Sequence, residues 1–314
     1  MKQKINLVII ILNLIVIFFS ISYSSDKAGT TTAVFLKILP GARPSGMGGA
    51  FTGICDDINS IYWNQSGLSQ ITTMELSGSY VKWIEGINSL VTEFVYPLKS
   101  VVLGFGLNYL SLGDIEIRDT NGQLADTNNS VYDSVVSIVI SRKFSSKFSI
   151  GGAVKYITQK LGPFESNTIG LDFGLLYIIR EDKFSTGLSL LNNAASMKID
   201  EISNPIPMTI KLGVGYKLSP DLLIALDIDN TSDSDTHIHI GGEYKFKEMY
   251  KIRVGYNQIE GLTFGFGINT ILKGEEFRMS SGSELGNELV IDYSAVSLGE
   301  FGLGHRISLG IKFK

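Results

Sequence analysis

Two histidines within an acidic stretch are the residues whose spacing best suits metal chemistry. His237 and His239 are two positions apart, and Asp233, Asp235 and Glu243 lie nearby. Residues at i and i+2 of a strand share one face, so both imidazoles can reach one ion. The sequence nevertheless favours a polar position in a lumen or at its rim, and we predict no metal site.

Oxygen ligands that suit calcium are also concentrated in this part of the sequence. The glycine and the terminal glutamate of an EF-hand loop are absent, however. The favoured interpretation is a solvated acidic outer loop, which contains Asp227, Asp229, Asn230, Ser232, Asp233 and Asp235.

No other pattern predicts catalysis. Serines are abundant, so no serine–histidine pairing that would make a lipid hydrolase is specific. Phosphate loops, zinc patterns and dinucleotide fingerprints are absent from the sequence, and Gly104-Phe105-Gly106 fits strand alternation with small inward residues. We therefore expect no enzymatic activity and no cofactor, and we expect such glycines to leave room for a plug or a guest molecule.

The elements that carry these residues are strands with one apolar and one polar face. Between Met208 and Leu218 every even position is apolar, and the odd positions are lysine, threonine or glycine. In a soluble sandwich the apolar face would pack on a core, whereas in an outer-membrane barrel it would face lipid. Only 18% of the 314 residues are charged, below the ~25% usual for soluble domains, which favours the barrel.

The sequence predicts an all-β fold, a transmembrane antiparallel β-barrel of about fourteen strands over residues 73–314. Short turns alternate with longer polar loops, which is typical of outer-membrane barrels, and closure is required because an open edge in lipid would leave backbone groups unpaired. An even count places both mature termini on the periplasmic side. One long connection, Lys273–Asn287, falls where a short turn is expected. The predicted strand centres are Ser79, Thr92, Gly106, Val136, Ala153, Phe173, Leu188, Leu212, Ala225, Gly242, Val254, Gly267, Asp292 and Leu309.

Charged residues on the polar phase of these strands should face the lumen. Both signs are present, so we expect them to cross-link the wall and to dock an N-terminal plug rather than to select an ion. They are Lys155, Asp172, Lys211, Asp227, Glu243, Lys251, Arg253 and Arg306.

The first residues have the features of an export signal. Lys2 and Lys4 precede an apolar run, and Ser22-Tyr23-Ser24 supplies small residues for cleavage, so residues 1–24 are predicted to be a signal peptide. The net charge of −4 gives no electrostatic footprint for nucleic acid, and the single Cys55 cannot form an internal disulfide. The predicted location is the outer membrane of a diderm bacterium, in contact with its lipid.

Residues 25–72 are predicted to form a short helical plug. Apolar residues recur at three- and four-residue intervals from Met47 to Tyr62, which is helical spacing. Asp56 or Asp57 is suited to cap a second helix over 58–63, and Gly67 to end it. The segment then either covers the barrel as a fixed plug or acts as a moving hatch, and the two roles are compatible.

The same segment carries the motif of a known family. From Gly41 to Leu68 it resembles the N-terminal signature of the PorV/PorQ family, within the group of fourteen-stranded outer-membrane barrels typified by the fatty-acid transporter FadL. The tail resembles that family too, through Asp292-Tyr293-Ser294 and Gly304-His305-Arg306. The motif residues are Gly41, Arg43, Gly46, Met47, Gly48, Gly49, Phe51, Asp56, Asp57, Tyr62, Trp63, Asn64 and Gly67.

The resemblance has two departures and implies two functions. The usual Asn-Pro-Ala-Gly-Leu run is Asn64-Gln65-Ser66-Gly67-Leu68 here, and the chain ends at Lys314 rather than on an aromatic residue. The FadL-like group implies a transporter for hydrophobic or amphipathic small molecules, whose apolar pocket would have to come from the plug and the outer loops. The PorV/PorQ family implies an accessory of a protein secretion system (type IX) that handles exported proteins, and a passive structural barrel is the third alternative.

Overall fold

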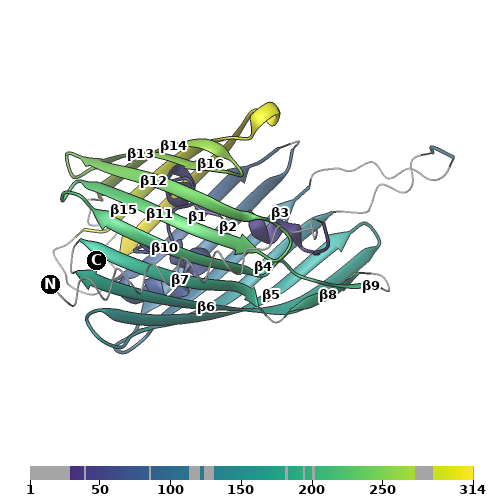
Figure 1. Cartoon of the computed structure of the whole chain (residues 1–314), viewed down its shortest axis with the longest axis horizontal. Helices are drawn as coiled ribbons and strands as arrows, with labels where there is room; N and C mark the ends of the chain where they lie inside the picture. The colour runs from purple at the N-terminus through teal and green to yellow at the C-terminus, as the bar shows by residue number, and fades with distance from the viewer. Residues whose placement is uncertain are drawn as a thin grey trace.

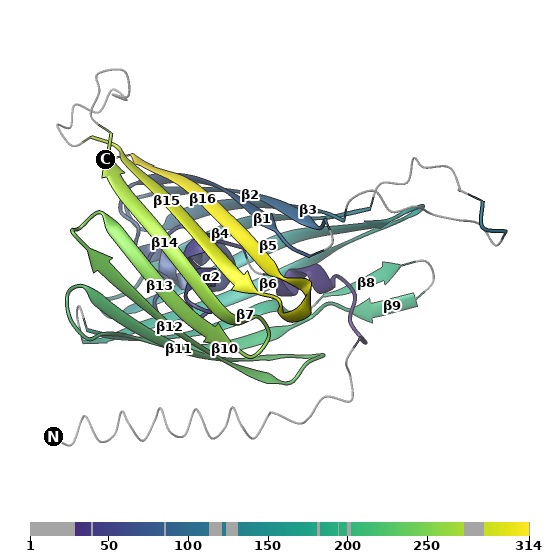
Figure 2. The same cartoon turned by 90° about the horizontal axis from the view of Figure 1, so that it is seen from above.

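The computed structural model is a closed antiparallel barrel with a plug inside it (Figures 1 and 2). It describes residues 29–38, 40–84, 86–112, 121–123, 131–180, 183–193, 195–199, 202–272 and 286–313. Fourteen strands close the barrel in the order β1-β16-β15-β14-β13-β12-β11-β10-β7-β6-β5-β4-β3-β2. Each of the fourteen predicted centres falls within one of these strands, so the predicted fold class is confirmed. Among the described residues, no helix is long and apolar enough to cross a membrane.

The secondary structure is dominated by strands of eight to seventeen residues. Its bounds are η1 Val34–Lys37, α2 Ala42–Gly46, α3 Ser60–Trp63, η2 Gln65–Gln70, β1 Met74–Lys82, β2 Asn88–Pro97, β3 Val102–Ser111, β4 Tyr132–Lys143, β5 Phe148–Leu161, β6 Phe164–Arg180, β7 Phe184–Asn193, β8 Ser196–Ile199, β9 Ile202–Pro205, β10 Thr209–Lys217, β11 Leu222–Thr231, β12 Thr236–Phe246, β13 Tyr250–Asn257, β14 Gly261–Ile271, β15 Glu288–Ser297, η4 Gly299–Phe301 and β16 Leu303–Phe313.

Strand alternation separates the outside of the wall from the lumen. On β3, Leu103, Phe105 and Leu107 are exposed, whereas Gly104 and Gly106 between them are buried. The same alternation on the other barrel strands surrounds the molecule with a belt of exposed apolar residues. Such a belt is stable against lipid and unstable against water.

The two ends of the barrel differ. At one end, hereafter the short-turn end, tight turns join the strands, for example at Leu98–Val101 and Leu218–Leu222. The long-loop end extends further, because β5 and β6 run on as a hairpin and β8 pairs with β9 in an extra two-stranded sheet (Figure 2). Residues 160–167 and 193–205 were predicted as plain loops. Within them, residues 160–161, 164–167, 196–199 and 202–205 are paired strand.

The connection between β14 and β15 joins strand ends at the short-turn end, because Glu288 pairs with Lys312 near the end of β16. The strand count is therefore right despite this long connection. Residues 273–285 of it lie outside the described residues, as do residues 1–28 with the predicted signal peptide.

The chain enters the barrel at the end opposite its C-terminus. The backbone N–H of Thr32 donates to the Pro205 carbonyl at the long-loop end, whereas Phe313 pairs with Met74 at the short-turn end. The first described residues thus lie at the end opposite the C-terminus, because the N-terminal segment crosses the lumen. The mature N-terminus lies outside the described residues, so its side of the membrane stays a prediction. We call residues 29–38 the strap and residues 40–72 the plug.

The plug is less helical than predicted. Met47, Phe51, Ile54, Ile58, Ile61 and Tyr62 are all buried, but only the last two lie in a helix. Gly48 and Gly49 have φ of 64° and 80°, so the chain turns there and cannot continue a right-handed helix. Asn59 precedes α3 with no side-chain cap, and Gly67 lies within η2 rather than at its end.

Candidate functional site

A ring of inward-facing glycines lets the plug lie directly against the wall. A Cβ at Gly104 would lie 2.7 Å from the Leu68 side chain, and one at Gly53 would lie 2.7 Å from the Gly213 backbone. Both separations are shorter than real Cβ contacts. At Gly53 the neighbour is backbone, so only glycine fits there without a shift of the plug or the wall. The ring consists of Gly104, Gly106, Gly151, Gly174, Gly187, Gly213, Gly241, Gly255 and Gly265.

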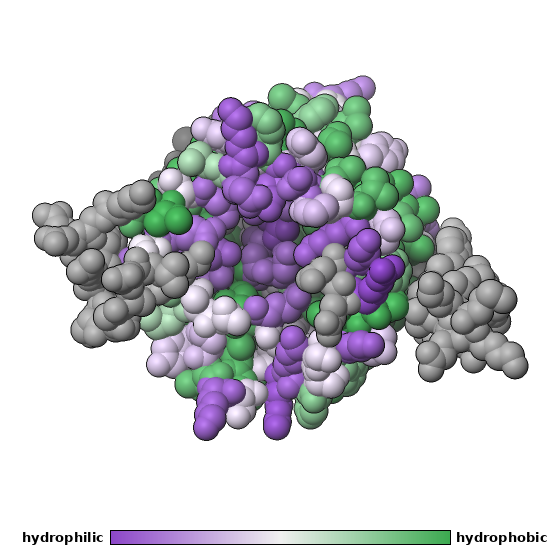
Figure 3. All heavy atoms as spheres, turned by 90° about the vertical axis from the view of Figure 1, so that its left-hand side faces the viewer, coloured by the Kyte–Doolittle hydropathy of each residue, from purple (hydrophilic) through white to green (hydrophobic). Residues whose placement is uncertain are grey.

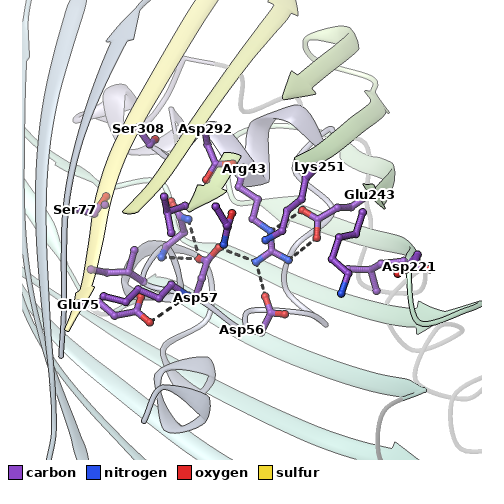
Figure 4. A pocket seen from close by; sticks show the side chains of 18 of the residues that line it. Arg43, Asp56, Asp57, Glu75, Ser77, Asp221, Glu243, Lys251, Asp292 and Ser308 are labelled. Atoms are coloured by element: carbon purple, nitrogen blue, oxygen red, sulfur yellow. Dashed lines mark hydrogen bonds and ion pairs between the residues drawn. The ribbon is translucent and has the colours of Figure 1, made fainter. Parts of the chain in front are cut away.

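Arg43 is the centre of an ion-pair network that docks the plug (Figure 4). Its guanidinium donates to both carboxylate oxygens of Glu243 on β12, at 2.9 and 3.0 Å. It also contacts Asp56 at 2.5 Å and Asp57 at 2.7 Å within the plug. The network continues along the wall through Arg253, which donates to Glu243 and to Asp292, each at 2.6 Å.

The network holds Arg43 and Asp57 in the charged form. Burial alone would raise the pKa of the Asp57 carboxyl, but the Arg43 guanidinium and the hydrogen bonds from Arg43 and Asn59 lower it below its ordinary value. Burial likewise opposes the charge of Arg43, and the surrounding carboxylates outweigh it and raise the pKa of Arg43. A buried cation with three carboxylate partners fixes the position of α2 relative to the wall.

Wall side chains also hold the plug backbone. The Asp227 carboxylate accepts hydrogen bonds from the backbone N–H groups of Phe51 and Thr52, at 3.0 and 2.7 Å. In the other direction, the Asn64 amide of the plug donates to the Leu175 carbonyl at 3.1 Å. The Gln65 amide donates to Asp172, which also pairs with Lys155 at 2.8 Å.

The remaining motif residues contribute to the plug interior. The Trp63 indole N–H donates to the Pro40 carbonyl at 2.9 Å, and the Phe51 ring meets the Trp63 ring edge-on. Tyr62 lies beside Gly106 of the wall. Gly46, Met47 and Gly48 pack on β12–β14, Gly49 packs beside His239, and a Cβ at Gly41 or Gly67 would collide with Asn59 or Cys55.

The plug separates two cavities. The larger, which we call the long-loop pocket, has a volume of about 810 Å³. The strap forms one wall of it, Trp63 of the plug and the inner faces of several strands form the rest, and the lining combines apolar and charged side chains. Its apolar members are Ala33, Val34, Phe35, Leu36, Ile38, Trp63, Trp83, Ile87, Leu110, Leu112, Leu161, Leu191, Ile199 and Ile259.

The strap is held to the barrel by a few polar contacts and one apolar cluster. Asp233 accepts hydrogen bonds from the Thr31 hydroxyl at 2.5 Å and from the Lys37 ammonium at 2.7 Å. Phe35 packs in a cluster with Leu110, Val135, Ile157, Met197 and Ile206.

The histidines lie on the polar side of the long-loop pocket. One ring nitrogen of His239 lies 2.8 Å from Asp229 and the other lies 2.8 Å from the Gly48 carbonyl, while Lys211 pairs with Asp229 at 2.8 Å. Asp227, Asp229 and Asp233 are buried, and each binds a different set of partners. The predicted solvated acidic loop is therefore wrong for these three residues. In the described part of the chain, no group of three His, Cys, Asp or Glu side chains is arranged to hold a metal ion.

The smaller cavity opens at the short-turn end. It has a volume of about 280 Å³ and is lined mainly by charged and polar side chains. Figure 3 shows this end of the molecule with a hydrophilic, hollowed centre. The labelled lining residues in Figure 4 include Arg43, Asp56, Asp57, Glu75, Glu243 and Lys251.

The eight predicted lumen charges all lie on inner-face positions. Seven are buried, and Lys251 is half-buried beside the short-turn cavity. Arg306 pairs with Glu260 at 2.8 Å at the long-loop pocket. Lys251 lines the short-turn cavity, and the other six pair within the wall or contact the plug as described above.

The apolar lining of the long-loop pocket was not predicted residue by residue. Leu110 and Leu191 lie on the inward phase of β3 and β7, where most residues are small or polar. Such interruptions of the polar phase near strand ends are the signal in the sequence that marks an apolar patch inside the barrel. The strap carries no comparable signal, because its short helix has no repeating pattern.

Comparison with solved structures identifies the fold. The Ralstonia pickettii toluene transporter TbuX superposes with a TM-score of 0.56 and 12% identity, over 87% of this chain and 97% of that one. The Pseudomonas putida toluene transporter TodX gives 0.56 and 14%, over 87% and 96%. The monoaromatic hydrocarbon channel CymD gives 0.55 and 12%, over 88% and 97%.

The fold is that of the FadL-like channels. The predicted resemblance to that group is thereby confirmed at the level of the fold. No protein-family model matches the chain, and no curated protein matches it in sequence.

Proposed function

We propose that the chain is an outer-membrane channel that takes up hydrophobic or amphipathic small molecules through the long-loop pocket. The observation that supports this most directly is an 810 Å³ pocket with an extensive apolar lining, placed above a plug inside a barrel with an apolar outer belt. Ligand sites are typically concave, largely apolar and of about 300–1,000 Å³. Channels of the same fold are toluene and monoaromatic hydrocarbon transporters, which supports this class of substrate.

We infer the orientation in the membrane from the difference between the two ends. Short turns face the periplasm and longer loops face the outside in outer-membrane barrels. The long-loop pocket would then receive molecules from outside the cell, and the polar short-turn cavity would face the periplasm. The plug between the two cavities serves as the floor of the binding site, and no enzymatic step is proposed.

Purification of the mature barrel from its own outer membrane, followed by mass spectrometry of bound small molecules, tests this function. We expect apolar or amphipathic molecules to co-purify with the wild type and to be depleted in Leu110→Asp, which puts a charge into the pocket. Glu300→Gln, in the exposed turn η4, is the matched control and should retain them. Equal depletion in both variants, or no bound molecule in the wild type, would contradict the proposal.

The PorV/PorQ resemblance supports an alternative, an accessory role in protein secretion. Its motif residues dock the plug, a task that any plugged barrel requires, so they favour the alternative only weakly. Exported proteins that share a C-terminal domain and co-purify in stoichiometric amounts would favour secretion over uptake.

A further inference from the structure

The charges of the long-loop pocket bear on which kind of ligand it takes, given the uptake function proposed above. Among the described residues, three Lys or Arg side chains border the pocket, and each already has a carboxylate partner. Because each positive charge is already balanced, an acidic headgroup would either displace one of these carboxylates or add an uncompensated negative charge to the pocket, and either costs several kcal/mol. The pairs are Lys37–Asp233 at 2.7 Å, Lys211–Asp229 at 2.8 Å and Arg306–Glu260 at 2.8 Å.

One carboxylate at the pocket has no such cation. Asp133 of β4 is only 4% exposed, and its Oδ1 has no hydrogen-bond partner. Among the described residues, no Lys, Arg or His forms an ion pair with it. This oxygen can accept a hydrogen bond from a ligand hydroxyl, and its charge repels a ligand carboxylate.

Arg306 supplies the complementary group. It is 2% exposed and borders the pocket, and two of its guanidinium nitrogens, Nε and Nη1, have no hydrogen-bond partner. Its third nitrogen donates to Glu260, and the guanidinium lies 5.2 Å from the centre of the Trp83 ring. A neutral oxygen next to an aromatic body could accept from Arg306, whereas a plain hydrocarbon would leave Asp133 and Arg306 unsatisfied.

We propose that the pocket is selective for uncharged amphiphiles, with a hydrocarbon or aromatic body and a hydroxyl or carbonyl at one end. The body lies against Trp63, Trp83 and Leu110, and the polar end lies toward Arg306 or Asp133. Free acids are disfavoured by the paired cations and by Asp133. Plain hydrocarbons enter the same pocket and bind less tightly.

The two tryptophans of the chain, Trp63 and Trp83, both border this pocket. Intrinsic fluorescence of the purified full-length barrel in detergent therefore reports binding at this place. Three probes share one body: octylbenzene, 4-octylbenzyl alcohol and 4-octylbenzoate. We expect the alcohol to bind about tenfold or more tightly than the other two, since hydrogen bonds to charged groups are stronger than neutral ones.

Two variants test whether Arg306 and Asp133 cause the preference for the alcohol. The double variant Arg306→Met/Glu260→Gln removes the donors without leaving an unpaired carboxylate, and it should lower the affinity for the alcohol about tenfold while that for octylbenzene stays the same. Asp133→Asn keeps a hydrogen-bonding oxygen but removes the charge. This variant should therefore bind the benzoate more tightly than the wild type and bind the alcohol with unchanged affinity. Retention of heat-modifiable migration on gels shows that each variant is folded.

The outcomes separate this inference from the function on which it rests. Tightest binding of the benzoate, or equal binding of alcohol and octylbenzene, would overturn the selectivity and leave an uptake channel. If none of the three probes binds the wild type, the proposed uptake function itself fails. Unchanged preferences in both variants would show that Arg306 and Asp133 do not bind the polar end of the ligand.

Discussion

The two cavities on either side of the plug differ in size and in chemistry. The long-loop pocket is about 810 Å³, with an apolar side that includes both tryptophans. The short-turn cavity is about 280 Å³ and is lined mainly by charged and polar side chains, Arg43 among them. Transfer of an apolar molecule from water into the long-loop pocket is favourable, whereas its transfer into the short-turn cavity is much less so. The plug thus divides the lumen into a place that retains such a molecule and a place that does not.

The largest expected effect comes from breaking this division at Arg43. Arg43→Met leaves Asp56 and Asp57 without their cation and leaves Glu243 with Arg253 alone. Loss of one partner of a buried ion pair costs about 3–5 kcal/mol. Cys55, the single cysteine, is buried in the plug, so its rate of labelling by a water-soluble maleimide measures plug opening. We expect that rate to rise at least about a hundredfold, since 1.4 kcal/mol is a factor of ten.

Arg142→Met is the matched control for this experiment. Arg142 is exposed near the short-turn end of β4 and has no ion pair among the described residues. Its loss should leave Cys55 labelling within about twofold of the wild type, as surface substitutions usually do. Equal rates in the two variants would show that the ion pairs of Arg43 do not hold the plug.

A smaller effect is expected from crowding the glycine ring. A Cβ at Gly241 of β12 would collide with Met47 of the plug, whereas Gly242, one residue on, faces outward with its nearest atom at 3.8 Å. Overpacking costs about 1–3 kcal/mol, so Gly241→Ala should accelerate Cys55 labelling about tenfold. Gly242→Ala is the neighbouring control and should change little, and the opposite order would mean that the plug lies elsewhere.

A substitution in one cavity alone sharpens the contrast between the two. Leu110→Asn removes apolar surface from the long-loop pocket and should weaken the binding of 4-octylbenzyl alcohol about tenfold, given about 1.5–3 kcal/mol for a buried leucine. Ser77→Ala, which changes the short-turn cavity, should leave binding unchanged. Tryptophan fluorescence titration measures both, and an equal loss would indicate that the two cavities act as one.

The smallest expected effect is the acid sensitivity of the short-turn side. The pKa of Asp57 is lower in the folded chain than its ordinary value of 3.8. Its stabilising contribution is therefore complete above about pH 3.8 and is lost as the pH falls through the lower folded value. The rate of Cys55 labelling after brief acid pulses should rise below pH 3.8 in the wild type. In Asp57→Asn, which has no carboxylate to protonate at this position, that increase should be absent.

Sequence alternation was sufficient to place all fourteen barrel strands, because each strand separates a lipid-compatible face from a lumen face along its length. The predicted second helix over residues 58–63 matches α3. The apolar spacing before it did not produce the expected helix, since Gly48 and Gly49 turn the chain. The inward charges were predicted as a set, whereas their partners depend on which strands the register brings together. Glu243, for example, contacts Arg253 across the β12–β13 register and Arg43 across the lumen.

The pocket was the least predictable part. Its apolar lining was expected from the plug and the outer loops, and Trp63 and Trp83 do come from there. Leu110 and Leu191 come from the wall, and the strap residues come from a segment whose path through the lumen depends on contacts with distant residues such as Asp233. Such contacts join residues about 200 positions apart, as in Lys37–Asp233 with a separation of 196, and local patterns carry no information on them.

The position of the plug ahead of β1 in the chain has a consequence for assembly. The barrel is closed by the pairing of its first strand with its last, β1 with β16. Strap and plug are synthesised before either partner of that seam is complete, and only the formation of the seam encloses them. The wall can therefore form around a segment that is already in place, and no free end has to be threaded through a finished ring.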